Sequence, residues 1–172
     1  MTDPIPTAEA IDRLTTAANA LTAMRGRIEA VGPWPVKLVE GEGPESEWGP
    51  PEILAHVSEM LPFWLGQIEL VLAGSPEPVP FGRMSTDRLR VMTIERDRSL
   101  PVRELLARIQ SDVVRYAGRL PELSEAELAR RGLHPRLGEM TVAEILPRFV
   151  VTHVEEHRVQ LEATLEERSS AG

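Results

Sequence analysis

The sequence of 172 residues contains no cysteine. This absence excludes a disulfide framework, a thiolate metal site and a cysteine nucleophile together. Any metal ion would have to be held by histidine and carboxylate side chains. The sequence also lacks a glycine-rich phosphate loop and a Gly-x-Ser-x-Gly elbow, which sets aside the enzyme classes that depend on them.

Positive charge and long apolar runs are scarce as well. The formal net charge is −8, and no run of Lys or Arg could neutralise a stretch of phosphates, so nucleic acid is not an expected partner. No apolar run approaches the ~20 residues that cross a bilayer. The beginning of the sequence has neither the basic start nor the apolar run of a signal peptide. We therefore expect a soluble cytoplasmic protein that does not bind membranes.

Aromatic residues make up 4% of the chain, so the core must consist mainly of aliphatic side chains, a composition that favours helices. Apolar residues recur three or four positions apart in four segments and predict helices over about 8–31, 50–73, 100–120 and 141–167. No segment shows a convincing strand pattern. The sequence thus predicts an all-α four-helix bundle, with residues 1–172 as a single domain.

The connection between the second and third predicted helices, roughly residues 75–98, is much longer than the ~2–8 residues that antiparallel neighbours need. It can travel the ~30 Å length of a 20-residue helix, so these two helices can be parallel. A helical turn is expected within it around residues 86–94. Capping boxes at Ser124 and Thr141 predict a short helix over 125–130 and the start of the fourth helix, with a loop over 132–138 between them.

Three of the four histidines fall on helix faces that are otherwise apolar. His56 lies on the inward stripe of the second helix, whereas His153 and His157 lie on that of the fourth, one turn apart, with ~5–6 Å between their Cβ atoms. Burying three unpaired imidazoles would be costly, which argues against the simpler interpretation that they are ordinary core residues. We predict that His56, His153 and His157 bind one divalent metal ion and leave a coordination position open for water or substrate. Imidazole ligands suit Zn or Ni first, with Fe, Cu or Mn as alternatives.

Other polar residues near these histidines have simpler interpretations. Glu52 and Glu59 lie one turn before and after His56 and could orient an imidazole from behind, although a solvated carboxylate is the simpler interpretation of each. His134, beside Pro135 in the predicted loop, is expected at the surface, with a lesser chance of lining the entrance to the site.

Several arginines in the 83–98 segment could receive an anionic substrate. They are Arg83, Arg88, Arg90, Arg96 and Arg98. Because Asp87, Glu95 and Asp97 are interleaved with them, local ion pairing is the favoured interpretation.

Three stretches of the sequence resemble a known family. They are Trp48-Gly-Pro-Pro-Glu-Ile-Leu-Ala-His56, His134-Pro-Arg-Leu-Gly-Glu-Met-Thr141 and Val151-Thr-His153-Val-Glu-Glu-His157. With one early histidine followed by a late His-x-x-x-His, the chain resembles the DinB/YfiT-like superfamily of metal-dependent four-helix-bundle proteins over nearly its whole length. The resemblance implies an up-down-down-up bundle with a long crossover between helices two and three. It also implies a metal site at His56, His153 and His157 and, often, a homodimer.

The same resemblance bears on function. Characterised members of the family include S-transferases that use bacillithiol or mycothiol, and a mycothiol-dependent maleylpyruvate isomerase. We therefore expect a metal-dependent transferase that joins a low-molecular-weight thiol to a small electrophile, with the metal lowering the pKa of the bound thiol or water. A metal-dependent hydrolase and a non-catalytic, stress-related metal-binding bundle are the alternatives. No catalytic residue can be named from the sequence.

Overall fold

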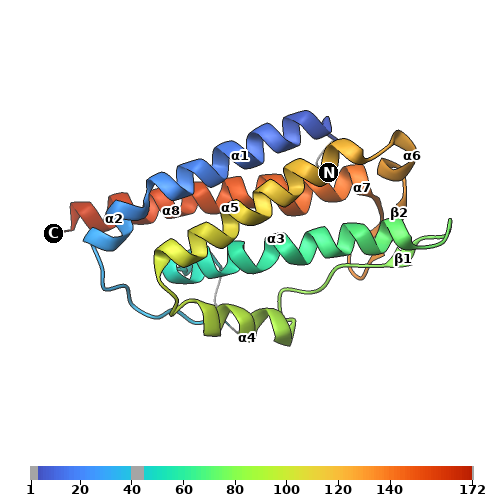
Figure 1. Cartoon of the computed structure of the whole chain (residues 1–172). Helices are drawn as coiled ribbons and strands as arrows, with labels where there is room; N and C mark the ends of the chain where they lie inside the picture. Colours follow the sequence, from blue (N-terminus) through green and yellow to red (C-terminus); the bar gives the residue numbers. More distant parts are fainter. Residues whose placement is uncertain (1–3, 40–44, 172) are drawn as a thin grey trace.

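The computed structural model describes residues 4–39 and 45–171, and its helices form a four-helix bundle with a small sheet at one end (Figure 1). The predicted first helix is two helices, α1 (Thr7–Ala23) and α2 (Arg25–Ala30). The second and third are α3 (Pro50–Ala73) and α5 (Val102–Arg119). The fourth comprises α7 (Val142–Ile145), a π-helical turn (Leu146–Val151) and α8 (Thr152–Ser170). The prediction of a single domain over 1–172 includes residues outside the described ranges.

The bundle has the up-down-down-up topology. Figure 1 shows α1 and α8 running in one direction and α3 and α5 in the other. Helix α3 packs against α5 and α8, and α1 packs against the same two helices. The crossover between the parallel helices α3 and α5 carries β1 (Val79–Pro80) and α4 (Arg88–Asp97), which packs beside α3. The predicted long crossover is confirmed, and its predicted helical turn is a complete helix.

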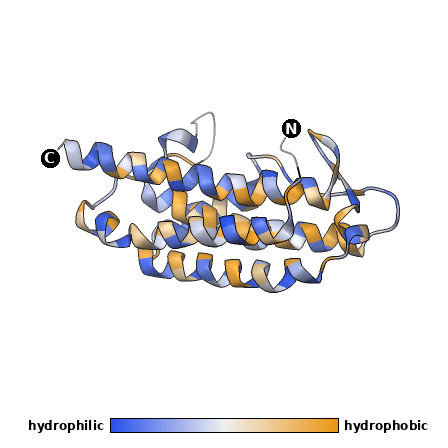
Figure 2. Cartoon of the chain, turned by 90° about the horizontal axis from the view of Figure 1, so that it is seen from above, coloured by the Kyte–Doolittle hydropathy of each residue, from blue (hydrophilic) through white to orange (hydrophobic). Residues whose placement is uncertain are grey.

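Aliphatic side chains fill the space between the helices. Hydrophobic and hydrophilic residues alternate along the long helices (Figure 2), because apolar stripes of these helices face the inside of the bundle. The buried residues of α1 and α5 show the expected spacing and include Leu14, Leu21, Leu105 and Ile109. Helix α3 is buried on most sides because α4, α5 and α8 all pack against it. This central helix carries His56.

A buried hydrogen bond joins α5 to α3 next to Pro62, the proline inside α3. The hydroxyl of Tyr116, which is fully buried, donates to the carbonyl oxygen of Leu61 at 2.7 Å. We expect Tyr116→Phe to lower the free energy of unfolding by about 1 kcal/mol, the net value of one buried hydrogen bond. Urea unfolding would measure the change. Val114→Ala, at an exposed position of the same helix, should change it by less than about 0.5 kcal/mol, and an equal loss in both variants would contradict the assignment.

The expectation that no strands form is wrong for one end of the bundle. Strands β2 (Arg131–His134) and β3 (Gly138–Thr141) form an antiparallel hairpin where a loop was predicted, after the short helix α6 (Glu125–Leu128). Strand β1 pairs with β2 in parallel, with Val79 opposite Gly132. Strands of two and four residues are too short to show a period-two pattern in the sequence. The sheet ties the crossover to the segment that leads into α7.

Candidate metal centre

The imidazole rings of His56, His153 and His157 converge between α3 and α8. The Nε2 atom of His153 lies 3.0 Å from Nε2 of His56 and 3.2 Å from Nε2 of His157. His56 and His157 are almost fully buried, whereas the His153 side chain is 31% exposed and borders a cavity. The structure thus brings together the three histidines that the sequence singled out.

Hydrogen bonds among the rings do not account for this arrangement. A ring nitrogen carries either one hydrogen or one lone pair, so Nε2 of His153 can make one good hydrogen bond but has two close nitrogen neighbours. Nitrogens ~2.0–2.1 Å from one ion at tetrahedral angles lie about 3.3 Å apart. The observed separations are close to that value, so the donor set fits a metal ion.

Burial keeps these imidazoles neutral, which is the form that binds metals. Loss of hydration lowers the pKa of His56 well below its ordinary value, and the charges of His157 and Arg90 lower it further. Burial likewise lowers the pKa of His157 to about 4 and lowers that of His153. Lone pairs are therefore available near neutral pH.

A carboxylate completes the cluster. Glu45, in a 3-10 turn (Glu45–Glu47) before α3, places Oε2 4.0 Å from Nε2 of His157. One potential ligand atom from Glu45 and one from each of the three histidines all lie within 4.8 Å of one another. The Glu45 carboxylate also forms an ion pair with Arg90, which is buried. Sequence reasoning missed Glu45 because it lies in a connection without periodicity, where no pattern distinguishes it from neighbouring acidic residues.

The backbone before α8 departs from regular α-helix. Pro147 lies near the start of a π-helical turn, Leu146–Val151. A π-turn adds a residue to one helical turn and so changes which side chains share a face, and such turns are frequent at functional sites. Here Phe149 and Thr152 border the same cavity as His153.

Residues behind the histidines fix two of the rings. Nδ1 of His157 lies 3.0 Å from Oε1 of Gln160. The side-chain nitrogen of Gln160, Nε2, donates to the backbone carbonyl oxygen of Glu45 at 2.6 Å. Trp48 packs its ring edge-to-face on His56 and parallel to His157, with ring centroids 5.5 and 6.5 Å apart. Gln160 therefore links His157 to the turn that carries Glu45, a role not foreseen from the sequence.

The favoured interpretation of Glu52 and Glu59 as solvated carboxylates is wrong, because both side chains are buried. Oε2 of Glu59 lies 4.0 Å from Nδ1 of His56, beyond hydrogen-bonding distance, and accepts from Arg83 at 2.5 Å. Nδ1 of His56 has no hydrogen-bond partner among the described residues. Glu52 instead accepts from the backbone amide of Lys37 at 3.0 Å. Of the two, Glu59 is the one whose carboxylate faces the Nδ1 side of the His56 ring.

The prediction that His134 lies at the surface is also wrong. Its side chain is 5% exposed and is packed between Phe81 and Phe149, with ring centroids 5.5 and 5.3 Å away. Its Nδ1 atom accepts from the backbone amides of Arg136 and Leu137, both at 3.3 Å. His134 therefore shapes the β2–β3 turn and has no place in the histidine cluster.

Most arginines of the 83–98 segment form ion pairs, but the favoured prediction of local pairing is confirmed only in part, for Arg96 and, with Asp87 at 4.0 Å, for Arg83. Arg96 pairs with the neighbouring Asp97 at 2.6 Å. Three arginines have partners outside the segment: Arg83 pairs with Glu59, Arg90 with Glu45 and Arg98 with Glu52. These pairs join the crossover to α3 and to the turn before it.

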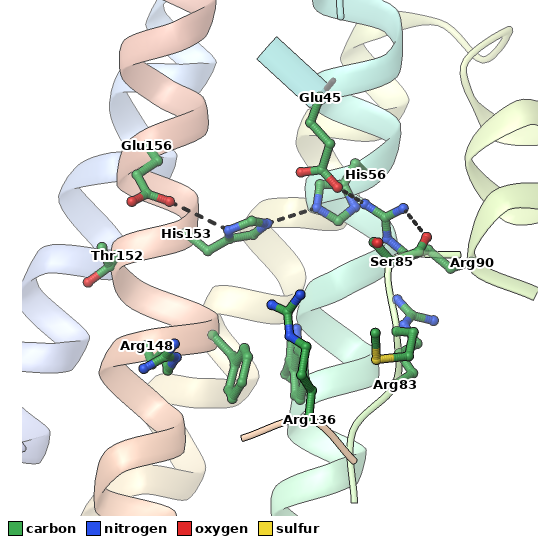
Figure 3. Close-up of a pocket in the computed structure, with 13 residues that line it drawn as sticks. Glu45, His56, Arg83, Ser85, Arg90, Arg136, Arg148, Thr152, His153 and Glu156 are labelled. Carbon is green, nitrogen blue, oxygen red and sulfur yellow. Dashed lines mark hydrogen bonds and ion pairs between the residues drawn. The ribbon is translucent and has the colours of Figure 1, made fainter. Parts of the chain in front are cut away.

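A cavity of about 520 Å³ opens beside the imidazoles (Figure 3). His56, His153 and Glu45 border one part of it, and Trp64 and Phe149, stacked with centroids 4.3 Å apart, border another. Four arginines also line the cavity, namely Arg83, Arg90, Arg136 and Arg148. A small molecule in this space would reach the histidine cluster through its exposed member, His153. In the described part of the chain, no helix combines the length and the apolar character required to span a membrane.

Comparison with known proteins places these observations in context. A family model described as the DinB superfamily matches residues 6–161. The structure is similar to that of YfiT from Bacillus subtilis, described as a probable metal-dependent hydrolase with an unusual four-helix bundle topology. The TM-score is 0.70 at 15% identity, over 95% of this chain and 87% of YfiT. At this level of identity the likeness establishes the fold alone. A comparison with curated protein sequences gave no match.

Proposed function

The chain belongs to the DinB superfamily, and on that premise we propose that it is a metal-dependent enzyme whose ion is held by His56, His153 and His157. The observation that carries the proposal is the convergence of three Nε2 atoms at 3.0 and 3.2 Å beside an open cavity. The donors fit the ion, since three neutral imidazoles and a nearby carboxylate suit Zn or Ni, with Fe or Mn as alternatives. When bound, the ion would make a thiol or water at its open position more acidic.

The protein supplies rigidity and exclusion of water. Buried packing and Trp48 hold the rings of His56 and His157, and Gln160 orients the latter. Glu45 lies at the cavity, fixed by Arg90, and is the carboxylate best placed to accept the proton that leaves the nucleophile. The stacked rings of Trp64 and Phe149 exclude water from one wall.

Transfer of a low-molecular-weight thiol is the reaction we favour. The chain has no cysteine, so the thiol must come from a cosubstrate, such as bacillithiol or mycothiol, and a cavity of about 520 Å³ offers space for a small electrophile beside it. The sulfur loses its proton, forms a bond to the electrophilic carbon, and the leaving group departs with the electrons of the broken bond. Metal-dependent hydrolysis is the second candidate, favoured by the structural likeness to YfiT.

Two assays on the same protein test the proposal. Purified protein, analysed for metal, should consume bacillithiol or mycothiol in the presence of 1-chloro-2,4-dinitrobenzene. Activity should fall at least about tenfold after chelation and return with Zn or Ni. A parallel assay with 4-nitrophenyl acetate measures hydrolysis. Chelator-sensitive ester cleavage without thiol consumption would favour the hydrolase, and bound metal without either activity would favour a storage or structural role, which would contradict the proposal.

A further inference from the structure

Two of the four arginines that line the cavity lack an acidic partner. Arg83 pairs with Glu59, and Arg90 pairs with Glu45. By contrast, none of the ion pairs found within residues 4–39 and 45–171 includes Arg136 or Arg148. Unpaired guanidinium groups that border a cavity are free to receive an anion.

The two unpaired arginines come from different elements but approach the same place. Arg136 lies in the turn between β2 and β3, and Arg148 in the π-helical turn. After burial, the charges of these two arginines are the causes that lower the pKa of His134, so both guanidinium groups lie near one buried ring. Figure 3 shows both of them below His153 and His56 in the view, Arg148 to the left and Arg136 near the centre.

An aromatic pair also lines the cavity. The stacked rings of Trp64 and Phe149 border the cavity, and they favour an apolar or planar segment of a ligand. The cavity therefore has three chemical parts: the histidine cluster, an aromatic wall and a pair of guanidinium groups. A ligand that used all three would carry an anionic group at one end and its reacting atoms at the other.

We propose that the substrate of this site is a small molecule with a carboxylate or phosphate group, which Arg136 and Arg148 bind while its reactive centre faces the histidines. The inference rests on the proposed function and specifies its substrate class. Because the whole chain carries a net charge of −8, its overall field repels anions. Two unpaired arginines at one cavity edge counter that repulsion locally, and planar guanidinium groups bind such oxyanions with two hydrogen bonds each.

Binding of succinate and of inorganic phosphate, measured by calorimetry on the metal-loaded protein, tests the proposal. We expect Arg136→Gln and Arg148→Gln each to weaken binding about tenfold. Arg148→Lys, which keeps the charge but loses the two-hydrogen-bond contact, should weaken binding less than Arg148→Gln does. Arg103→Gln is the matched control, because Arg103 is exposed on α5 and outside the cavity, and should bind as the unaltered protein does. The anion that binds more tightly identifies the group.

Three outcomes would overturn the inference: no binding of either anion, equal weakening by Arg103→Gln, or binding that a chelator abolishes while both arginine variants retain it. The last result would place the anion on the ion alone. Metal analysis and circular dichroism of each variant separate this inference from the proposed function. Full metal content with arginine-independent anion binding contradicts the inference alone. Arginine-dependent binding to a protein that holds no metal supports the anion site and contradicts the metal-dependent enzyme.

Discussion

Replacing His153 with alanine should abolish metal binding, reducing the metal content from about one ion per chain to less than about one tenth. His153 is the ring whose Nε2 atom lies close to both of the others, so its removal leaves two of the three imidazole donors. Metal analysis after dialysis measures the loss. Saturating zinc, at about 100 times its dissociation constant, should stabilise the unaltered protein by about 2.7 kcal/mol and leave the variant's melting temperature nearly unchanged.

His134→Asn is the control for this experiment. His134 is the remaining histidine of the chain, and its contacts lie in the β2–β3 turn. The variant should be less stable but should keep its metal, provided that circular dichroism shows a folded bundle. A His153→Ala protein that binds metal as tightly as the unaltered chain would show that the three rings do not form the site.

Gly82→Ala should be among the most destabilising single-methyl changes in the chain. Gly82 has φ of +79°, and a Cβ atom at this position would lie 2.5 Å from Cδ2 of His134. The backbone conformation costs about 1–2 kcal/mol for alanine, and the clash with a ring held between two phenylalanines adds about 1–3 kcal/mol. We expect a loss of about 2–5 kcal/mol in chemical unfolding, with perturbed binding at the cavity, since Arg83, Met84 and Ser85 follow directly and line it.

The contrasting substitution is Gly118→Ala. Gly118 is exposed within α5, and a Cβ atom there meets nothing within 4 Å. Alanine restricts the unfolded chain and favours helix, so stability should increase by about 0.5–1 kcal/mol. If both glycine variants changed stability in the same direction, the assigned role of the Gly82 conformation would be wrong.

The helices and the histidine cluster were predictable because both depend on spacing within long periodic segments. The bounds of α3 matched the prediction, and the inward stripe of that helix placed His56 opposite the pair on α8. The π-helical turn was not predictable, because a single proline indicates a kink but not its form.

Other features escaped prediction because they depend on tertiary contacts. Glu45 is brought to the site by the path of a connection without periodicity, and Arg90 then fixes it. His134 is buried because two phenylalanines from distant segments enclose it, and nothing adjacent to it in the sequence records that enclosure. The sheet also depends on tertiary contacts, because β1 lies in the crossover and pairs with β2, which comes much later in the chain.

The distribution of the three histidines over two helices, α3 and α8, affects the order in which the site assembles. His153 and His157 share one helix and are neighbours as soon as that helix forms, but His56 is 97 residues away from His153 in sequence. Closing a loop of that size is entropically costly and is favoured late, once most of the bundle is already packed. A nascent chain therefore offers a metal two weak donors, and full affinity develops only when the last helix docks, so tight metal capture marks completed folding.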